Sequence, residues 1–343
     1  MEVECRTAWF SAGAAMRRRD FMKIIGGAAA GWPLAADAQQ RERMRRIGFL
    51  WSAFTAEDPE GQARGNAFVQ GLQESGWSVG RNLRIDNRWG LNQTDRLRRG
   101  AEELVTLGPD LLFGAGTPAT AALQQATRAL PIVFANVLDP VGAGYVDSLA
   151  RPGSNATGFM TIEYGQAGKW LELLKQIAPH VTRVGVFRSL TTEAGVSQLA
   201  AIQAVAPILG VEVIPITVRS DADLERAVSD FARRPNGGLI TPFGFGTTTR
   251  GVIALAARHQ LPAIYNSRDY VVNGGLISYG TDIVDLYRRS AGYVDRVLKG
   301  EKPADLPVQV PTKYEVVINL KTANTLGLTV PLPLRGRADE VIE

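Results

Sequence analysis

Short apolar runs alternate with amphipathic stretches along the first half of the chain. The run RIGFLWS at Arg46–Ser52 has strand character, whereas Gln62–Ser75 places Phe68, Val69 and Leu72 on one face of a helix. The predicted strands are Arg46–Ser52, Leu83–Trp89, Asp110–Gly114 and Pro131–Val137, and the predicted helices are Gln62–Ser75, Thr94–Leu107 and Thr117–Ala129. Strands that alternate with helices in this way predict a parallel sheet with helices on both faces.

The pattern restarts after Arg151–Gly158, a turn-rich segment that we interpret as the first crossing between two lobes. Further strands are predicted at Arg183–Phe187, Val211–Val218, Gly238–Pro242, Pro262–Tyr265, Gly275–Tyr279 and Tyr314–Ile318, and helices at Gly165–Ile177, Glu193–Leu209, Asp221–Arg233, Thr247–His259, Asp282–Leu298 and Leu320–Leu326. The sequence therefore predicts an α/β fold with two doubly wound parallel-sheet lobes joined by a hinge. We expect an N-terminal lobe at 45–155, a C-terminal lobe at 160–280, and a helix and tail at 281–343 that pack back across the lobes.

The N-terminus has the three regions of an export signal. Arg17–Lys23 is charged, Ile24–Gly31 is short and weakly apolar, and Ala36-Asp37-Ala38 is a small-residue cleavage site. The sequence RRDFMK within it resembles the twin-arginine export motif. The alternative is a chance basic patch on an N-terminal helix, and either Met1 or Met16 could be the start. We predict a signal peptide at 1–38, cleaved near Ala38, and a periplasmic mature protein.

Composition excludes several kinds of chemistry. The chain of 343 residues has 45% hydrophobic and 21% charged residues, which is typical of a globular protein. Its one cysteine, Cys5, lies in the predicted signal, so the mature protein would have neither a disulfide nor a thiol nucleophile. Only two histidines are present, the net charge is only +4, and the bases of the predicted mature part are spread along helices. We therefore expect no metal, no cofactor and no nucleic-acid partner.

Several segments carry a family resemblance when taken in order. They are IGFL at Ile47–Leu50, GLQESGWSVGRN at Gly71–Asn82, GTPATAALQQAT at Gly116–Thr127, PIVFANVLDPVGAG at Pro131–Gly144, SLARPGSNATGF at Ser148–Phe159, and the tail from Lys299. With these segments the chain resembles the ABC-transporter substrate-binding family related to the tryptophan/tyrosine-type binding proteins. The resemblance implies a type I periplasmic-binding-protein fold, no catalysis, and an ABC permease in the inner membrane as partner. We expect the protein to be a monomer.

One position departs from the family pattern. An Asn-Pro-like pair often follows the first strand of the second lobe in this family, but Arg188-Ser189 stand there in this chain. The resemblance therefore implies that the ligand contacts of the second lobe differ here.

Ligand-binding candidates are expected where strands end, because the carboxyl ends of parallel strands line the crevice in such folds. The turn around Gly116 would let the backbone approach a ligand, and the following helix would offer free N–H groups to a carboxylate. An ordinary strand-to-helix turn capped by Thr117 is the alternative. The full set of candidates is Ser52, Gly116, Thr117, Pro118 and Asp139 in the first lobe, and Arg188, Ser189, Thr241, Phe243, Asn266, Tyr279 and Asp282 in the second.

Two charged candidates have specific hypotheses. Asp139 could accept a hydrogen bond from an ammonium group, or simply form the turn before Pro140. Arg188 could bind a carboxylate through two parallel hydrogen bonds, or be a solvated rim charge. An aromatic side chain after the first strand, Trp51 or Phe54, could stack on a ligand ring or pack within the lobe.

Three functions compete for this fold. Transport binding would capture a small polar, amino-acid-like or carboxylate ligand by hinge closure and deliver it to a permease. A sensor of the same fold would report to a membrane receptor, and the sequence does not separate it from transport. An exported α/β enzyme is disfavoured, because only two histidines are present, both at predicted helix ends, and they suggest no Ser–His–Asp set. We predict the solute-binding component of an ABC-type importer, without catalytic residues.

Overall fold

The computed structural model describes residues 44–161, 163–188, 193–218, 220–243 and 249–343. The predicted signal peptide at 1–38, with its twin-arginine motif and cleavage site near Ala38, lies outside these ranges, as does Ser189. Within them, no helix is both long enough and apolar enough to span a bilayer.

The first sheet contains only parallel strands. They are β1 (Arg45–Trp51), β2 (Leu83–Trp89), β3 (Leu111–Ala115), β4 (Ile132–Val137) and β5 (Ala156–Met160), in the spatial order β2-β1-β3-β4-β5. Because all five run the same way, their carboxyl ends meet at one edge of the sheet. The residues after Trp51, Ala115 and Val137 therefore lie along that edge.

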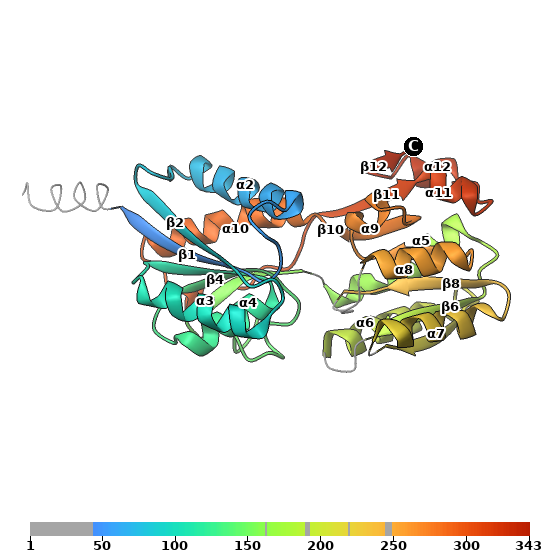
Figure 1. Cartoon of the computed structure of the whole chain (residues 1–343), viewed down its shortest axis with the longest axis horizontal. Coiled ribbons are helices and arrows are strands. Elements are labelled where there is room, and N and C mark those ends of the chain that lie inside the picture. The colour runs from blue at the N-terminus through green and yellow to red at the C-terminus, as the bar shows by residue number, and fades with distance from the viewer. Residues whose placement is uncertain (1–43, 162, 189–192, 219, 244–248) are drawn as a thin grey trace, which may run out of the picture. The chain divides into compact units, whose positions relative to one another are not determined.

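Helices cover both faces of this sheet (Figure 1), namely α2 (Pro59–Glu74) and α10 (Ile283–Leu298) on one face, and α3 (Thr94–Thr106) and α4 (Thr117–Ala126) on the other. Side chains alternate along β1, so that Phe49 and Trp51 pack with α2 and α10, and Leu50 packs with α3 and α4. The doubly wound arrangement thus follows from apolar residues on both sides of each strand.

The second sheet is larger and contains one reversed strand. Its strands are β6 (Arg183–Arg188), β7 (Glu212–Thr217), β8 (Gly237–Thr241), β9 (Ala263–Tyr265), β10 (Ile277–Thr281), β11 (Tyr314–Asn319) and β12 (Glu340–Ile342), in the order β12-β11-β10-β9-β8-β6-β7. All the neighbouring pairs are parallel except β10 and β11. The predicted parallel sheet is confirmed for β6 to β10. The strand β11, which the sequence placed in the tail, joins this sheet antiparallel to β10 after the chain returns from the first lobe.

Two groups of helices cover the second sheet. One core cluster joins the sheet to α5 (Gly168–Ile177), α6 (Glu193–Val205), α11 (Leu320–Thr325) and α12 (Leu332–Arg335). The opposite cluster joins it to α7 (Asp221–Ala232), α8 (Thr249–Arg258) and α9 (Arg268–Val272). The described ranges also contain the short 3₁₀ helices η1 (Tyr164–Ala167) and η2 (Pro303–Asp305).

The first crossing lies later in the chain than predicted. Arg151–Gly158 does not leave the first lobe, because β5 begins at Ala156 and pairs with β4. A Cβ atom at Gly158 would lie 2.0 Å from the carbonyl oxygen of Phe134. The glycine that suggested a turn therefore permits close approach of two strands, and the chain leaves the first sheet only after Met160.

The chain passes between the two lobes three times, after β5, between β10 and α10, and before β11. The Thr281 hydroxyl donates a hydrogen bond to the Thr161 carbonyl, which joins the first two segments. The Asp282 N–H donates to the Lys313 carbonyl at 3.2 Å, and the Lys313 ammonium lies 2.7 Å from the Asp282 carboxylate. These contacts bind the three connecting segments to one another.

Candidate functional site

The carboxyl edge of the first sheet brings Ser52 against the turn that opens α4. The Ser52 hydroxyl accepts a hydrogen bond from the Ala119 N–H at 2.9 Å, and Ser52 is only 8% exposed. Gly116 has a φ of 97°, and a Cβ atom there would lie 2.8 Å from the Ser52 oxygen. Ser52, Gly116, Thr117 and Pro118 therefore lie together, and glycine is required by both the backbone angle and the close contact.

The first turn of α4 is largely satisfied by the protein itself. Ala119 donates to Ser52, Thr120 donates to the Gly116 carbonyl at 3.1 Å, and Pro118 has no N–H. The prediction that this helix offers free N–H groups is therefore wrong at these three positions. The available donors are instead the hydroxyl protons of Ser52 and Thr117, because a hydroxyl that accepts one hydrogen bond can still donate another.

Thr117 links this turn to the neighbouring strand. Its hydroxyl oxygen accepts a hydrogen bond from the Leu138 N–H at 3.2 Å, and its carbonyl accepts one from the Tyr145 hydroxyl at 3.4 Å. The side chain of Thr117 therefore contacts the segment after β4 and does not cap its own helix. The Leu138 contact orients the Thr117 hydroxyl, and the Tyr145 contact holds the Thr117 backbone.

Asp139 forms a turn after β4. Its carboxylate accepts a hydrogen bond from the Gly142 N–H at 2.8 Å, and its carbonyl accepts one from Ala143 at 3.1 Å. These contacts agree with the interpretation that Asp139 forms a turn. That Asp139 binds an ammonium group stays a prediction.

Sequence reasoning missed Asn136, which has a φ of 62° and accepts a hydrogen bond from the Thr161 hydroxyl at 2.9 Å. Asparagine tolerates the left-handed region, so Asn136 near a strand end was a usable signal.

In the second lobe, the ends of β8 and β9 place three candidates side by side. Thr241 is fully buried, and its hydroxyl oxygen has no hydrogen-bond partner among the described residues. The Phe243 backbone is held by the Gln198 side chain, whose oxygen accepts from the Phe243 N–H at 3.0 Å and whose nitrogen donates to the Phe243 carbonyl at 3.3 Å. Asn266 donates to the Pro242 carbonyl at 2.7 Å. The segment Thr241–Phe243 is thus fixed from two sides.

Tyr279 belongs to an aromatic cluster. Its ring stacks on Tyr314 with centroids 5.4 Å apart, and its hydroxyl lies 3.4 Å from the Gln166 side-chain oxygen. Its carbonyl accepts a hydrogen bond from the Trp170 indole at 2.6 Å. Burial, followed by the neighbouring Tyr314 and Glu172, raises the pKa of Tyr279 to about 12, so the phenol stays protonated at neutral pH.

The two charged candidates of the second lobe have protein partners. The Arg188 guanidinium donates to the Thr217 hydroxyl at 3.2 Å. Asp282 caps α10 by accepting from the Asp285 N–H at 2.9 Å, and it pairs with Lys313. Burial raises the pKa of Asp282, but the hydrogen bonds from Lys313 and Asp285 outweigh burial and leave this pKa below its usual value. Asp282 is therefore part of the connection between the lobes.

Sequence reasoning missed Gln198, Tyr314, Trp170 and Gln166 in the second lobe. Gln198 reaches Phe243 from 45 positions away, and Trp170 reaches Tyr279 from 109 positions away. No local pattern marks such contacts. Among the described residues, no group of three potential metal ligands occurs.

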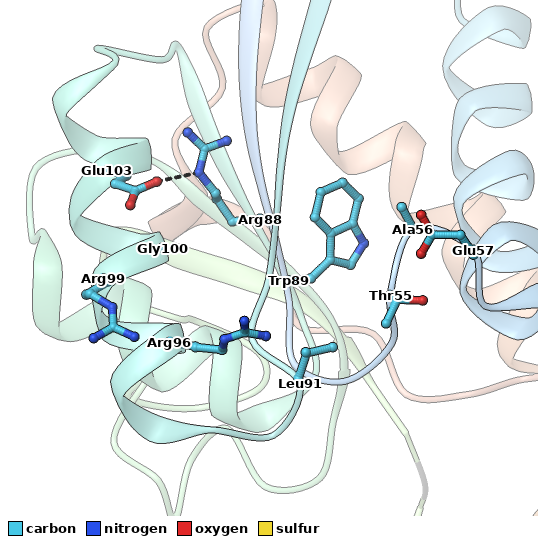
Figure 2. A pocket seen from close by; sticks show the side chains of 10 residues that line it. All are labelled: Thr55, Ala56, Glu57, Arg88, Trp89, Leu91, Arg96, Arg99, Gly100 and Glu103. Atoms are coloured by element: carbon cyan, nitrogen blue, oxygen red, sulfur yellow. Dashed lines mark hydrogen bonds and ion pairs between the residues drawn. The ribbon is translucent and has the colours of Figure 1, made fainter.

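A separate hollow of about 530 Å³ lies in the first lobe, beside the ends of β1 and β2 (Figure 2). It is lined by Thr55, Ala56, Glu57, Arg88, Trp89, Leu91, Arg96, Arg99, Gly100 and Glu103. None of the candidate residues predicted from the sequence lines it.

Comparison with known proteins gives a consistent result. The family model for ABC transporter substrate binding proteins matches residues 55–342. A tyrosine-binding protein from Clostridioides difficile is 26% identical over 273 residues, which cover 79% of this chain and 79% of that protein.

Solved structures agree in fold. An ABC domain from Streptococcus pneumoniae in complex with L-Trp has a TM-score of 0.78 and 28% identity, covering 87% of this chain and all of that one. A ligand-free, open substrate binding protein with adhesive properties from Clostridium difficile has a TM-score of 0.71 and 25% identity, covering 87% and 99% of the two chains. The predicted periplasmic-binding-protein fold is confirmed. The chain belongs to the family of ABC transporter substrate binding proteins.

Proposed function

We propose that this protein binds an aromatic amino acid in the periplasm and delivers it unchanged to an ABC permease for import. The names of its relatives support the ligand class, since one is a tyrosine-binding protein and another was solved with L-Trp. The N-terminal signal predicted at 1–38 supports the periplasmic location. Motion about the three connecting segments would close the lobes on the ligand.

The observation that carries this proposal is the position of the Ser52 hydroxyl. It is buried at the end of β1, it is oriented by the Ala119 N–H, and it keeps one proton to donate. The Thr117 hydroxyl is oriented in the same way by the Leu138 N–H. Two fixed hydroxyl donors at one sheet edge suit the two oxygens of an amino-acid carboxylate, because hydrogen bonds to an ionised acceptor are the stronger kind.

The second lobe supports the aromatic part of the proposal. Phe243 and Tyr279 are half-buried, and each is held by contacts to its backbone. Rigid aromatic side chains favour a ligand ring through stacked or edge-to-face contacts. Asp139 would accept a hydrogen bond from the ligand ammonium through the capacity that its turn contacts leave unused.

The test is calorimetric titration of the chain from Gln39 onward with L-tryptophan, L-tyrosine, L-phenylalanine and L-leucine, together with tryptamine, which lacks the carboxylate. We expect an aromatic L-amino acid to bind and to be recovered unchanged, and tryptamine not to bind. Ser52→Ala should weaken binding by about tenfold, the value of one hydrogen bond to a charged group, whereas Ser148→Ala, an exposed serine, should not. Consumption of the ligand, or equal binding of tryptamine, would contradict the proposal.

A further inference from the structure

The hollow in the first lobe has walls of different chemistry. In Figure 2, Trp89 stands between the β2 backbone and the loop that carries Thr55 and Glu57, whereas Arg88 and Arg99 lie on the side of α3. A second hollow of about 540 Å³ shares Arg88, Arg99 and Glu103 with the first. The two hollows therefore follow one face of α3, which gives an extended surface in place of a closed cavity.

Two of the arginines on this surface have no acidic partner. Arg88 pairs with Glu103 at 2.6 Å. Arg96 and Arg99 are exposed and make no ion pair or side-chain hydrogen bond within the described ranges. They lie three positions apart on α3, so both project from the same side of the helix. The surface thus offers two adjacent cations that this lobe does not neutralise.

Trp89 adds an exposed aromatic side chain to the same surface. It is 36% exposed, and in the described part of the chain its indole contacts no other aromatic ring. Tryptophan and arginine are the residue types most enriched among those that dominate binding energy at protein interfaces. The exposed Trp89 indole and the unpaired guanidinium groups of Arg96 and Arg99 are therefore the residue types expected at the centre of a protein–protein interface.

The surface adjoins the carboxyl edge of the first sheet, where Ser52 lies. Gly90 donates a hydrogen bond to the Trp51 carbonyl at 2.8 Å, and Asn92 donates to the Ser52 carbonyl at 2.7 Å. The segment that follows Trp89 is therefore hydrogen-bonded directly to the end of β1. A partner bound at Trp89 and Arg96 would therefore lie next to a segment that is bonded to the end of β1.

We propose that this surface, defined by Trp89, Arg96 and Arg99, docks an acidic segment of the permease. The inference rests on the proposed function, which supplies the partner. Carboxylates of the permease would pair with Arg96 and Arg99, and an apolar side chain would pack on Trp89. Charge complementarity of this kind mainly accelerates association and makes it depend on salt.

The test compares the double variant Arg96→Glu/Arg99→Glu with a matched control, Arg81→Glu/Arg151→Glu. The control makes the same charge change at exposed arginines outside both hollows. Two quantities are measured for each, namely the uptake of the labelled amino acid by cells of the natural host and the dissociation constant of the purified protein for that amino acid. The docking variant should lower uptake by about tenfold or more and leave the dissociation constant for the amino acid unchanged, since reversing both charges replaces attraction by like-charge repulsion at the docking surface.

Trp89→Ala should lower uptake in the same way. Equal loss of uptake in the docking and control variants would overturn the inference, because it would reflect net charge alone. Unchanged uptake in the docking variant would also overturn it. A wild-type protein that binds no amino acid would contradict the proposed function. That failure is distinguished from failure of the docking inference, because ligand binding is measured on the purified protein and docking is measured by uptake.

Discussion

Gly116 lies directly against Ser52, since a Cβ atom at Gly116 would be 2.8 Å from the Ser52 hydroxyl oxygen. Its φ of 97° also lies in the region that other residues rarely adopt. Gly116→Ala should therefore lower the free energy of unfolding by about 2–3 kcal/mol, through backbone strain and the displacement of Ser52. Urea unfolding measures this, and ligand affinity should fall in parallel.

Gly108→Ala is the matched control. Gly108 has a φ of 59°, but a Cβ atom there would meet nothing within 4 Å. It should show only the cost of the left-handed backbone, about 1 kcal/mol. If the two alanine variants lose equal stability, the contact with Ser52 is not what restricts position 116.

Thr241→Val separates stability from binding. The Thr241 hydroxyl is buried and has no partner among the described residues, so replacing it by a methyl group removes the cost of burying a polar group. We expect the ligand-free protein to gain about 1 kcal/mol of stability in urea. If the ligand hydrogen-bonds to this hydroxyl, the same variant should bind more weakly in calorimetry. A loss of stability without ligand would contradict this interpretation.

Gln198→Leu tests how Phe243 is held. The substitution keeps most of the volume but removes both hydrogen bonds to the Phe243 backbone. We expect a loss of about 2 kcal/mol in the free energy of unfolding, because the N–H and the carbonyl of the half-buried Phe243 both lose their hydrogen-bond partners. Gln203→Leu, at an exposed position of the same helix, should have little effect. The ratio of affinities for L-tryptophan and L-leucine should also fall in Gln198→Leu and remain constant in the control.

The raised pKa of Glu315 predicts that the free energy of unfolding depends on pH. Burial raises the pKa of its carboxyl from 4.5 to about 7, Arg268 opposes the rise, and the carboxylates of Asp282, Asp339 and Asp269 add to it. The folded protein therefore binds this proton more tightly than the unfolded chain, so the stabilisation is present below pH 4.5 and is lost as the pH rises towards 7. Glu315→Gln should match the wild type near pH 5.

Near pH 8 the glutamine variant should be the more stable by about 1 kcal/mol, a value reduced for the part of the side chain that water screens. Urea unfolding at the two pH values measures this difference. Glu57→Gln, at an exposed position, serves as the control and should show no such change. An identical difference between wild type and Glu315→Gln at both pH values would contradict the prediction.

Local patterns predicted much of the fold. Short apolar runs located β1 and β3. Asp282, placed at the start of the predicted helix Asp282–Leu298, caps α10. The helix α2 begins three residues before its predicted start, because Asp58 caps it and Pro59 fits its first turn. Gly158 misled the prediction of the first crossing, since a glycine marks a turn and a close strand contact equally well in sequence.

The site was predicted less completely. Ser52 and Gly116 were found because they follow strands, and the carboxyl edge of a parallel sheet is defined by topology alone. The partners that orient these residues were not found, since the Ser52 contact with Ala119 spans 67 positions and the Gln198 contact with Phe243 spans 45. Such pairs are set by tertiary packing, which leaves no periodic trace in a single sequence.

The placement of α10 has a consequence for the order in which the lobes form during synthesis. This helix packs against α2 and covers Phe49, Phe68 and Trp51, yet it follows all the strands of the second lobe up to β10. The first lobe therefore cannot bury that face until residue 298 has left the ribosome, roughly 7 to 28 seconds after its last strand at typical synthesis rates. During this interval a nascent chain exposes an aromatic surface that the finished protein hides, and the second lobe is itself incomplete, because β11 and β12 follow α10 in the chain.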